Sequence, residues 1–390
     1  MYQLSKTLAD VGHEVTVVAD VVEEDFPSLH GVRFVPPGGR MQRLAARLPG
    51  NFAGWLVKHL VGNLAGTAAA RRLLRDEHFD IVHVHGNLAA WLIARFSPAP
   101  VVYTEHDSTP WSCHYRRLHE RMIRRAVYRL VNVRAFRRVA GVATIYESLR
   151  VELVERFGIP EANVHTILNG ADFDVFNPDV GGFAGPIPFD RYCLFVGRLT
   201  PRKAPDLLLH ALVEAPEARC VFAGDGPMRA GLEALAAELG VRERVAFLGS
   251  ISPDRLAPLY ANADLLVIPS FSEGTPLVAF EAMACGTPVL SSRIAGLPEL
   301  VHDWSTGFLV KPGDVGQLAM AIRFLTADPE ALARMGEEAQ RRVRKRFLWP
   351  NVARQYLALY HSLLPADDEA PAETPAGEHL TVAAAKAVAA

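Results

Sequence analysis

The chain has 390 residues, of which 50% are hydrophobic and 22% are charged, and its formal net charge is −2. This length exceeds the roughly 250–300 residues at which a single core stops growing, so we expect two domains. The near-neutral charge argues against a protein that binds nucleic-acid phosphates over its whole surface, and no apolar run reaches the roughly 18–20 residues of a membrane-spanning helix.

The predicted elements of the first half alternate between helix and strand. The chain opens inside a helix, with Leu4, Leu8 and Val11 along one side and Gly12 suited to the position just past its end. The expected strands are 14–19, 32–35, 81–85, 101–104 and 139–144. This alternation predicts βα units around a parallel sheet.

A Gly- and Pro-rich stretch at 178–190 lacks periodicity and is interpreted as an interdomain linker. A second series of expected strands follows it, at 193–196, 220–223, 245–248, 265–268, 289–291 and 308–310. We therefore expect α/β domains at 1–177 and 191–348, each doubly wound, with ligands beyond the carboxyl ends of the strands. The last two expected parts are a helix at 349–364 that packs back on the first domain, and a disordered tail at 365–390.

The most informative segment is 270–288, directly after the expected strand 265–268. Pro276 suits the start of a helix, where backbone N–H groups and the helix dipole favour a phosphate. Glu273 lies before this helix and Glu281 on its second turn, and carboxylates accept charge-assisted hydrogen bonds from sugar or ribose hydroxyls. The alternative is that both glutamates are solvated surface acids.

A second motif, 193–204, runs from a buried strand into a helix start. Gly197 lets the backbone turn, which leaves Arg198 and Lys203 at the carboxyl edge of the sheet. Two cations at this edge could neutralise a diphosphate. The alternative is an exposed basic loop without a ligand.

In this order and separation, the two motifs resemble the carboxyl-terminal domain of the retaining glycosyltransferases of family four. That family has the GT-B fold, in which two Rossmann-like, doubly wound domains face a cleft. The resemblance extends to about Leu364 and includes the stretches 167–172, 176–178, 224–227, 247–249 and 296–299.

The resemblance implies a role for each matching residue. Arg198 and Lys203 would hold the donor diphosphate, Glu281 the ribose, and Glu273 hydroxyls of the transferred sugar. The backbone that would lie against the phosphates and the sugar belongs to Gly274, Thr275, Pro276 and Leu277.

The segment 101–107 is similar to the family segment whose histidine lies near the donor sugar, so His106 is the expected counterpart. His83 and His85 alternate along a strand and should face the same side of the sheet. His85 is a candidate for the acceptor pocket. For both His106 and His85, the alternative is a histidine without a catalytic role.

We expect no cofactor, because the nucleotide sugar is itself a substrate. We also expect no metal ion. His83 and His85 lack a third ligand, and the Asp-x-Asp at Asp172 and Asp174 lies in an Asn-Gly segment that argues against a metal site. The cysteines Cys113, Cys193, Cys220 and Cys285 match no zinc spacing, and no secretory signal precedes them, so we expect reduced thiols in a cytoplasmic protein.

The expected function is transfer of a sugar from a nucleotide sugar, with UDP favoured over GDP, to an unidentified glycan, lipid-linked or small-molecule alcohol. Arg198, Lys203 and the helix start would stabilise the departing diphosphate, so a strong general acid is not required. The resemblance implies a retaining, metal-independent reaction, and no protein nucleophile is evident.

The match fails at the start, because family members begin with a strand and a glycine-rich loop ahead of the first helix. We therefore expect the first strand of the amino-terminal domain to be missing, which would expose strand edges and apolar surface. One alternative function is an amino-terminally truncated, catalytically weak or inactive nucleotide-binding protein of the same fold. Another is a GT-B epimerase or a glycan phosphorylase.

The stretch from Arg116 to Arg138 combines many arginines with apolar residues at near-helical spacing. Such a segment can bind an anionic membrane surface, which would make the protein peripheral on the inner face of the membrane. It could also attract a phosphorylated acceptor. The alternative is an ordinary amphipathic helix with a solvated arginine face.

Overall fold

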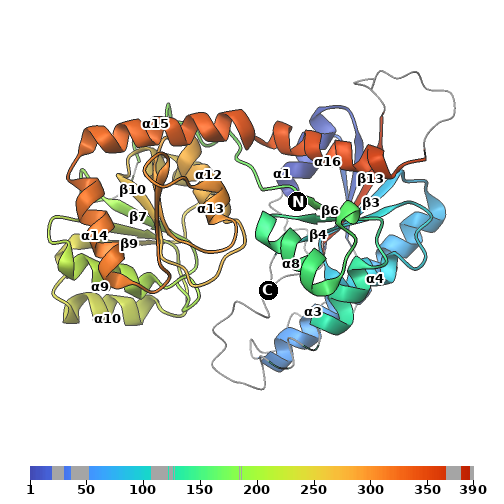
Figure 1. Cartoon of the computed structure of the whole chain (residues 1–390), viewed down its shortest axis with the longest axis horizontal. Helices are drawn as coiled ribbons and strands as arrows, with labels where there is room; N and C mark the ends of the chain where they lie inside the picture. Colours follow the sequence, from blue (N-terminus) through green and yellow to red (C-terminus); the bar gives the residue numbers. More distant parts are fainter. Residues whose placement is uncertain are drawn as a thin grey trace. The chain divides into compact units, whose positions relative to one another are not determined.

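The computed structural model describes residues 1–19, 30–36, 52–106, 122, 126, 128–183, 185, 187–365 and 379–386. The chain divides into two compact units (Figure 1). Unit 1 contains the described residues up to Ile167 together with those from Trp349 onward, and unit 2 contains Leu168–Leu348. Each unit is an α/β layer structure around a parallel sheet, as the alternation of elements predicted.

Unit 1 has a seven-stranded parallel sheet in the order β2-β1-β13-β3-β4-β5-β6. Its strands are β1 (Glu14–Ala19), β2 (Val32–Val35), β3 (Ile81–Val84), β4 (Val101–Glu105), β5 (Gly141–Thr144), β6 (Val164–Thr166) and β13 (Thr381–Lys386). Its helices are α1 (Tyr2–Asp10), α3 (Phe52–Asp76), α4 (Asn87–Ile93), α7 (Val133–Phe136), α8 (Glu147–Phe157) and α16 (Trp349–Leu363), with short helical turns η1 (Tyr128–Asn132) and η2 (Glu161–Asn163).

Helices cover both faces of this sheet, with α1 and α16 on one side and α3 and α4 on the other (Figure 1). Burial on both faces is seen in β3, all four residues of which are buried. Leu4 and Leu8 of α1 are buried in the core, whereas Val11 is 57% exposed. The expectation for Val11 was wrong because the helix ends at Asp10, and Gly12 then turns the chain with a φ of +99°.

The expected disordered tail was wrong for 379–386, because this segment contains β13. The strand lies in parallel between β1 and β3, with Val382 opposite both Val15 and Ile81. The carboxylate of Asp80 accepts the backbone N–H of Thr381 at 2.7 Å, which fixes the start of the strand. Small alanines allow burial on both faces, and the same alanine-rich composition gave the sequence the appearance of a tail.

Unit 2 has a six-stranded parallel sheet in the order β12-β11-β10-β7-β8-β9. Its strands are β7 (Cys193–Val196), β8 (Cys220–Ala223), β9 (Val245–Gly249), β10 (Leu265–Ile268), β11 (Val289–Ser292) and β12 (Gly307–Val310). Its helices are α9 (Pro205–Glu214), α10 (Arg229–Glu238), α11 (Pro253–Ala261), α12 (Leu277–Ala284), α13 (Leu297–Leu300), α14 (Val315–Thr326) and α15 (Pro329–Arg346), with the short helical turn η3 (Arg242–Arg244).

Two hydrophobic clusters sandwich this sheet. Side chains of α9, α10 and α14 form one cluster, and side chains of α11, α12 and α15 form the other. The segment 178–190, which we expected to be an interdomain linker, instead packs on unit 2. Its residues Val180, Phe183 and Phe189 contact the second cluster. The boundary between the units therefore falls earlier, after Ile167.

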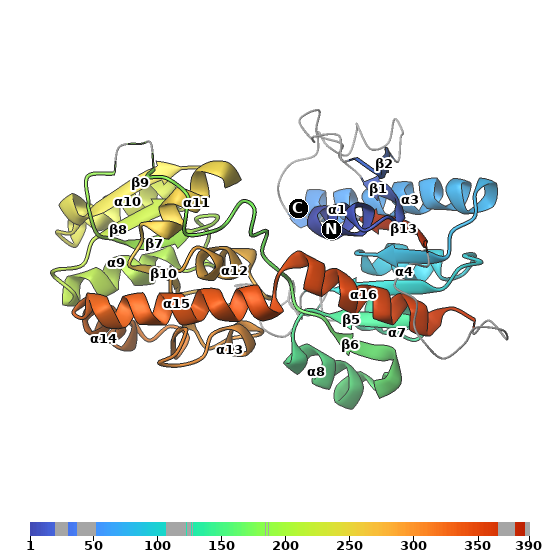
Figure 2. The same ribbon diagram turned by 90° about the horizontal axis from the view of Figure 1, so that it is seen from above.

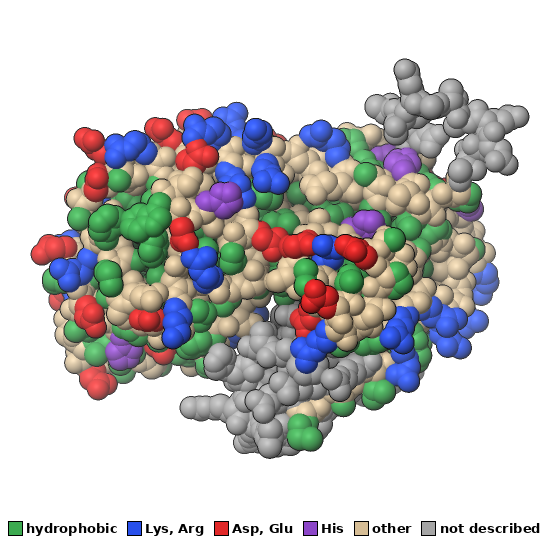
Figure 3. All heavy atoms as spheres, viewed as in Figure 1, with side chains coloured by type: hydrophobic (Ala, Val, Ile, Leu, Met, Phe, Trp, Pro, Cys, Tyr) green, Lys and Arg blue, Asp and Glu red, His purple; other side chains and the backbone are tan. Residues whose placement is uncertain are grey.

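The charged side chains of unit 2 are of both signs and are interspersed over the face that Figure 3 shows. Among the described residues, no helix is long and apolar enough to cross a membrane. Part of the proposed membrane-binding segment from Arg116 to Arg138, namely 116–121, 123–125 and 127, lies outside the described residues. Its described end includes Arg137, whose guanidinium donates to the carbonyl of Phe157 at 3.3 Å.

Candidate functional site

The candidate site in unit 2 lies where the loops after β7, β8 and β10 meet at the carboxyl edge of the sheet. From β7 the chain adds β8 and β9 on one side, and it then returns to place β10 on the other side of β7. Such a reversal of strand order opens a crevice between the loops that follow the two diverging strands. The two motifs from the sequence occupy these loops.

Glycines allow the first two loops to touch. A Cβ atom on Gly224 would lie 1.9 Å from the carbonyl oxygen of Gly197, and one on Gly226 would lie 2.5 Å from that of Leu199. Gly197 itself has a φ of +143°, which favours glycine. The backbone N–H of Leu199 donates to the carbonyl of Asp225 at 2.9 Å, so the loop after β8 supports the loop that carries Arg198.

Lys203 and Glu273, which the sequence assigned to separate roles, form an ion pair. Lys203 Nζ lies 2.6 Å from Glu273 Oε1, and the hydroxyl of Ser270 donates to the same oxygen at 2.7 Å. The side chains are 17% and 5% exposed, so water screens the pair only weakly. Arg198 is exposed on the same loop as Lys203.

The expected helix start after β10 is present as α12, which begins at Leu277 with Pro276 as its N-cap. The N-cap residue Pro276 makes no side-chain hydrogen bond to this terminus, and the first N–H groups of a helix can bind an anionic ligand. The preceding loop is held from two sides. Asn169 Nδ2 donates to the carbonyl of Thr275 at 2.9 Å, and the N–H of Gly296 donates to that of Gly274 at 3.4 Å.

Glu281 lies on the second turn of α12 and accepts a hydrogen bond from the hydroxyl of Tyr260 at 2.9 Å. Burial raises the pKa of Glu281 to about 7, and the hydrogen bond from Tyr260 opposes this rise in pKa. Neither Tyr260 nor Asn169 was a candidate from sequence. Asn169 lies in a stretch that carried the resemblance, whereas no local signal marks Tyr260.

In unit 1, His85 and His106 lie side by side at the carboxyl ends of β3 and β4. His85 Nδ1 lies 2.8 Å from His106 Nε2, and the rings are stacked. His83 is on the same face as His85 but is buried, with its nitrogens 2.7 Å from Thr104 Oγ1 and from the hydroxyl of Tyr360. Burial lowers the pKa of His83 to about 3, so it is neutral.

The Asp-x-Asp sequence at Asp172 and Asp174, which superficially resembles a metal site, forms a local turn. Asp172 accepts the backbone N–H of Asp174 at 3.1 Å, which is a turn within the Asn-Gly segment. Within the described part of the chain, no group of three or more His, Cys, Asp or Glu side chains is arranged to hold a metal ion. The described cysteines Cys193, Cys220 and Cys285 are buried free thiols.

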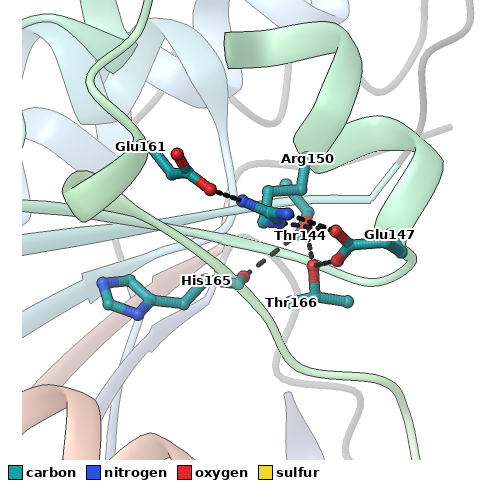
Figure 4. A network of polar contacts seen from close by, with 6 residues as sticks. All are labelled: Thr144, Glu147, Arg150, Glu161, His165 and Thr166. Atoms are coloured by element: carbon teal, nitrogen blue, oxygen red, sulfur yellow. Dashed lines mark hydrogen bonds and ion pairs between the residues drawn. The ribbon is translucent and has the colours of Figure 1, made fainter.

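A polar network missed by the sequence analysis joins α8 to β5 and β6 (Figure 4). Glu147 accepts the hydroxyl of Thr166 at 2.6 Å and the guanidinium of Arg150 at 2.7 Å, and Arg150 also donates to Glu161 at 2.9 Å. Arg150 holds the pKa of Glu147 below its usual value. The network anchors Thr166, which precedes Ile167, the last residue of unit 1 before unit 2 begins at Leu168. We assign the network a structural role.

Comparison with protein families matches both parts of the chain. Residues 1–175 match the family described as Glycosyltransferase Family 4, and residues 187–342 match the family described as Glycosyl transferases group 1. The loops that carry Arg198, Lys203 and Glu273, and the helix α12 that carries Glu281, lie within the second match.

Individual relatives agree with the families. The chain is 34% identical over 391 residues to the D-inositol 3-phosphate glycosyltransferase of Mycobacterium tuberculosis, covering 92% of this chain and 77% of that protein. Among solved structures, sucrose-phosphate synthase from Thermosynechococcus elongatus has a TM-score of 0.76 at 25% identity, covering 93% of this chain and 92% of that one. Anabaena HepE in complex with UDP-glucose has a TM-score of 0.65 at 21% identity, covering 90% and 100%. The expected GT-B fold class is thereby confirmed.

Proposed function

Because the chain belongs to glycosyltransferase family 4, we propose that it transfers a sugar from a UDP-sugar to an acceptor hydroxyl with retention of anomeric configuration. The observation that carries this proposal is the convergence of Arg198, Lys203, Glu273 and the start of α12 at one edge of the unit 2 sheet. Cations, a carboxylate and a helix N-terminus are the groups that a sugar diphosphate needs.

The diphosphate would be bound by Arg198, Lys203 and the first N–H groups of α12. The ion pair with Glu273 already fixes the side chain of Lys203. Binding the phosphates therefore costs Lys203 little further rotational freedom. Positive charge at fixed positions stabilises the negative charge that develops as the bond to the diphosphate breaks. We therefore propose a reaction that needs no metal ion.

The two glutamates would contact opposite ends of the donor. Glu273, beside Lys203, would accept from hydroxyls of the transferred sugar, and Glu281, held by Tyr260, would accept from the ribose. Support for UDP comes from Anabaena HepE, which has been solved with UDP-glucose. GDP-sugars are the competing class.

In the proposed reaction, the bond between the anomeric carbon and the diphosphate oxygen breaks, and its electron pair leaves with UDP. The acceptor oxygen attacks from the same face, and its proton passes to a phosphate oxygen. His106, oriented by His85, would contact the transferred sugar. A phosphorylated polyol is the first acceptor to test, since the Mycobacterium tuberculosis relative is named for D-inositol 3-phosphate.

The test is thermal stabilisation and slow donor hydrolysis with a panel of UDP- and GDP-sugars, using wild type, Arg198→Ala and Glu281→Ala. Arg191→Ala is the control, because Arg191 is an exposed cation of unit 2 that pairs with Asp264 instead of lining the site. At one hundred times Kd, a bound nucleotide should stabilise wild type and the control by about 2.7 kcal/mol. The site variants should lose this stabilisation.

The outcomes separate the candidate functions. Stabilisation by UDP-sugars with turnover supports the transferase. Stabilisation without hydrolysis or transfer to any acceptor supports the alternative of an inactive nucleotide-binding protein. If neither nucleotide class stabilises the folded chain, the proposed donor site is wrong.

A further inference from the structure

The neighbouring strands β3 and β4 carry two layers of polar side chains on one face. His83 and Thr104 form the inner layer, and His85 and His106, two residues further along the chain and directly after each strand, form the outer layer. The inner layer is buried, whereas His106 is exposed. The proposed function uses only the outer layer, so the inner pair has no role in it.

The inner layer is tied to α16, which lies along the same face of the unit 1 sheet as α1 (Figure 2). Tyr356 and Tyr360 are four residues apart and therefore project from one side of this helix. The hydroxyl of Tyr360 lies 2.7 Å from His83 Nδ1, and that of Tyr356 lies 3.3 Å from Thr104 Oγ1. Both tyrosines are buried.

These contacts hydrogen-bond both ring nitrogens of His83. Because the hydroxyls of Tyr360 and Thr104 can each donate or accept, either neutral tautomer of the ring is satisfied. Since His83 stays neutral, this arrangement persists over the working pH range. The inner layer is therefore a rigid surface with both ring nitrogens of His83 bonded.

The outer layer rests on that surface. The His85 ring centroid is 4.3 Å from that of His83 and 5.1 Å from that of His106. A tilt of the His83 ring would therefore displace His85, and the 2.8 Å contact between His85 and His106 would lengthen. The orientation of His106 thus depends on a hydroxyl that comes from the far end of the chain.

We propose that Tyr360 and His83 are positioning residues, which hold the His85–His106 pair in the one orientation that sugar transfer requires. The expected effect on sugar transfer rests on the proposed function. The geometric part, that the Tyr360 hydroxyl orients His85 and His106 through His83, can be tested without any substrate.

The experiment compares wild type with Tyr360→Phe, which removes one hydroxyl and keeps the ring. Tyr192→Phe is the matched control, because Tyr192 is also buried and donates one hydrogen bond, to the carbonyl of Leu259 at 2.9 Å in unit 2. Long-range ¹H–¹⁵N spectra of histidine-labelled protein report the tautomer of each ring. Turnover is followed as kcat and KM for the donor.

In Tyr360→Phe we expect the ring nitrogen signals of His83, His85 and His106 all to shift, and kcat to fall about tenfold, the effect of one lost hydrogen bond. The donor KM should stay within about twofold, because the proposed diphosphate site is in unit 2. The control should change neither the spectra nor kcat. Tyr356→Phe should have a smaller effect, since its contact with Thr104 is longer.

Shifts confined to His83, with His85 and His106 unchanged, would overturn the proposal, and so would an unchanged kcat in a variant whose outer pair has moved. Thermal unfolding shows whether each variant is folded. If Tyr360→Phe does not fold, the same comparison is made with Tyr356→Phe. If wild type turns over no donor, the proposed function fails, while the spectra still decide whether Tyr360 orients the pair.

Discussion

At the scale of single residues, Glu281 shows how burial converts an ordinary carboxyl group into one sensitive to neutral pH. Its pKa is raised to about 7 because burial penalises the charge, and Tyr260 donates a hydrogen bond to its carboxylate. A ribose would supply further donors to the charged form. Folding and donor binding should therefore respond to pH in opposite directions at this residue.

The folding effect follows from the sign of the shift. Between pH 4.5 and about 7 the folded state holds a proton on Glu281 that the unfolded state has lost, so stability falls as pH rises through this window. Relative to Glu281→Gln, the wild type should lose roughly 3 kcal/mol between pH 4 and pH 8. Urea unfolding of both proteins across this range measures the difference, and parallel pH profiles would contradict a raised pKa.

Nucleotide binding should depend on pH in the opposite direction and become stronger as pH rises. If the ribose hydroxyls bind ionised Glu281, nucleotide binding at pH 7 should release about half a proton in wild type and none in Glu281→Gln. Titration calorimetry in two buffers of different ionisation enthalpy measures this number. Equal proton release by both proteins would remove Glu281 from the nucleotide site.

At the scale of elements, β13 decides whether unit 1 has a continuous sheet. The strand pairs with β1 on one side and β3 on the other, and it carries the buried residues Val382 and Ala384 into the core beneath α1 and α16. Without it, two strand edges and the apolar surface around them would face water. A sheet interrupted at this position would also lose support for β3, which carries His83 and His85.

Deletion of residues 379–390 should therefore unfold unit 1 and leave unit 2 folded. Circular dichroism and limited proteolysis would show the loss of one unit, and a synthetic peptide of the same residues added in trans should restore part of it. Arg191→Ala, which alters only an exposed ion pair in unit 2, is the control. A deletion variant with wild-type stability would show that β13 does not hold the centre of the sheet.

At the scale of the whole molecule, the chain consists of two units that each bury a core of their own. The proposed diphosphate and ribose contacts all belong to unit 2, whereas the histidine pair belongs to unit 1. Units with separate cores can unfold separately, so a ligand that binds one unit should stabilise that unit first.

Denaturant unfolding should accordingly show two transitions that respond differently to UDP. The transition of unit 2, identified by its shift in Glu281→Gln, should move to higher denaturant with nucleotide, and the transition of unit 1, identified with the Tyr360→Phe variant, should move less. Tryptophan fluorescence and circular dichroism together resolve the two steps. A nucleotide effect confined to the unit 1 transition would contradict the assignment of the donor site.

The sequence by itself determined the strand positions of the unit 2 sheet, and those of the unit 1 sheet except β6 and β13. It also determined the start of α12, the place of Glu281 on this helix, and the loops that carry Arg198, Lys203 and Glu273. These features depend on local patterns: apolar runs of strand length, glycine where the backbone must turn, and proline at a helix start. The resemblance to family 4 rests on the same short motifs, and the comparisons confirm it.

Only the tertiary structure decided which of these residues meet. Lys203 pairs with Glu273, Tyr260 holds Glu281, and Tyr360 reaches His83 across 277 positions of sequence. The structure likewise assigned an alanine-rich terminal segment to the centre of a sheet. No local pattern encodes such pairs, because their stability comes from burial and hydrogen bonds between elements that become neighbours only when the chain folds.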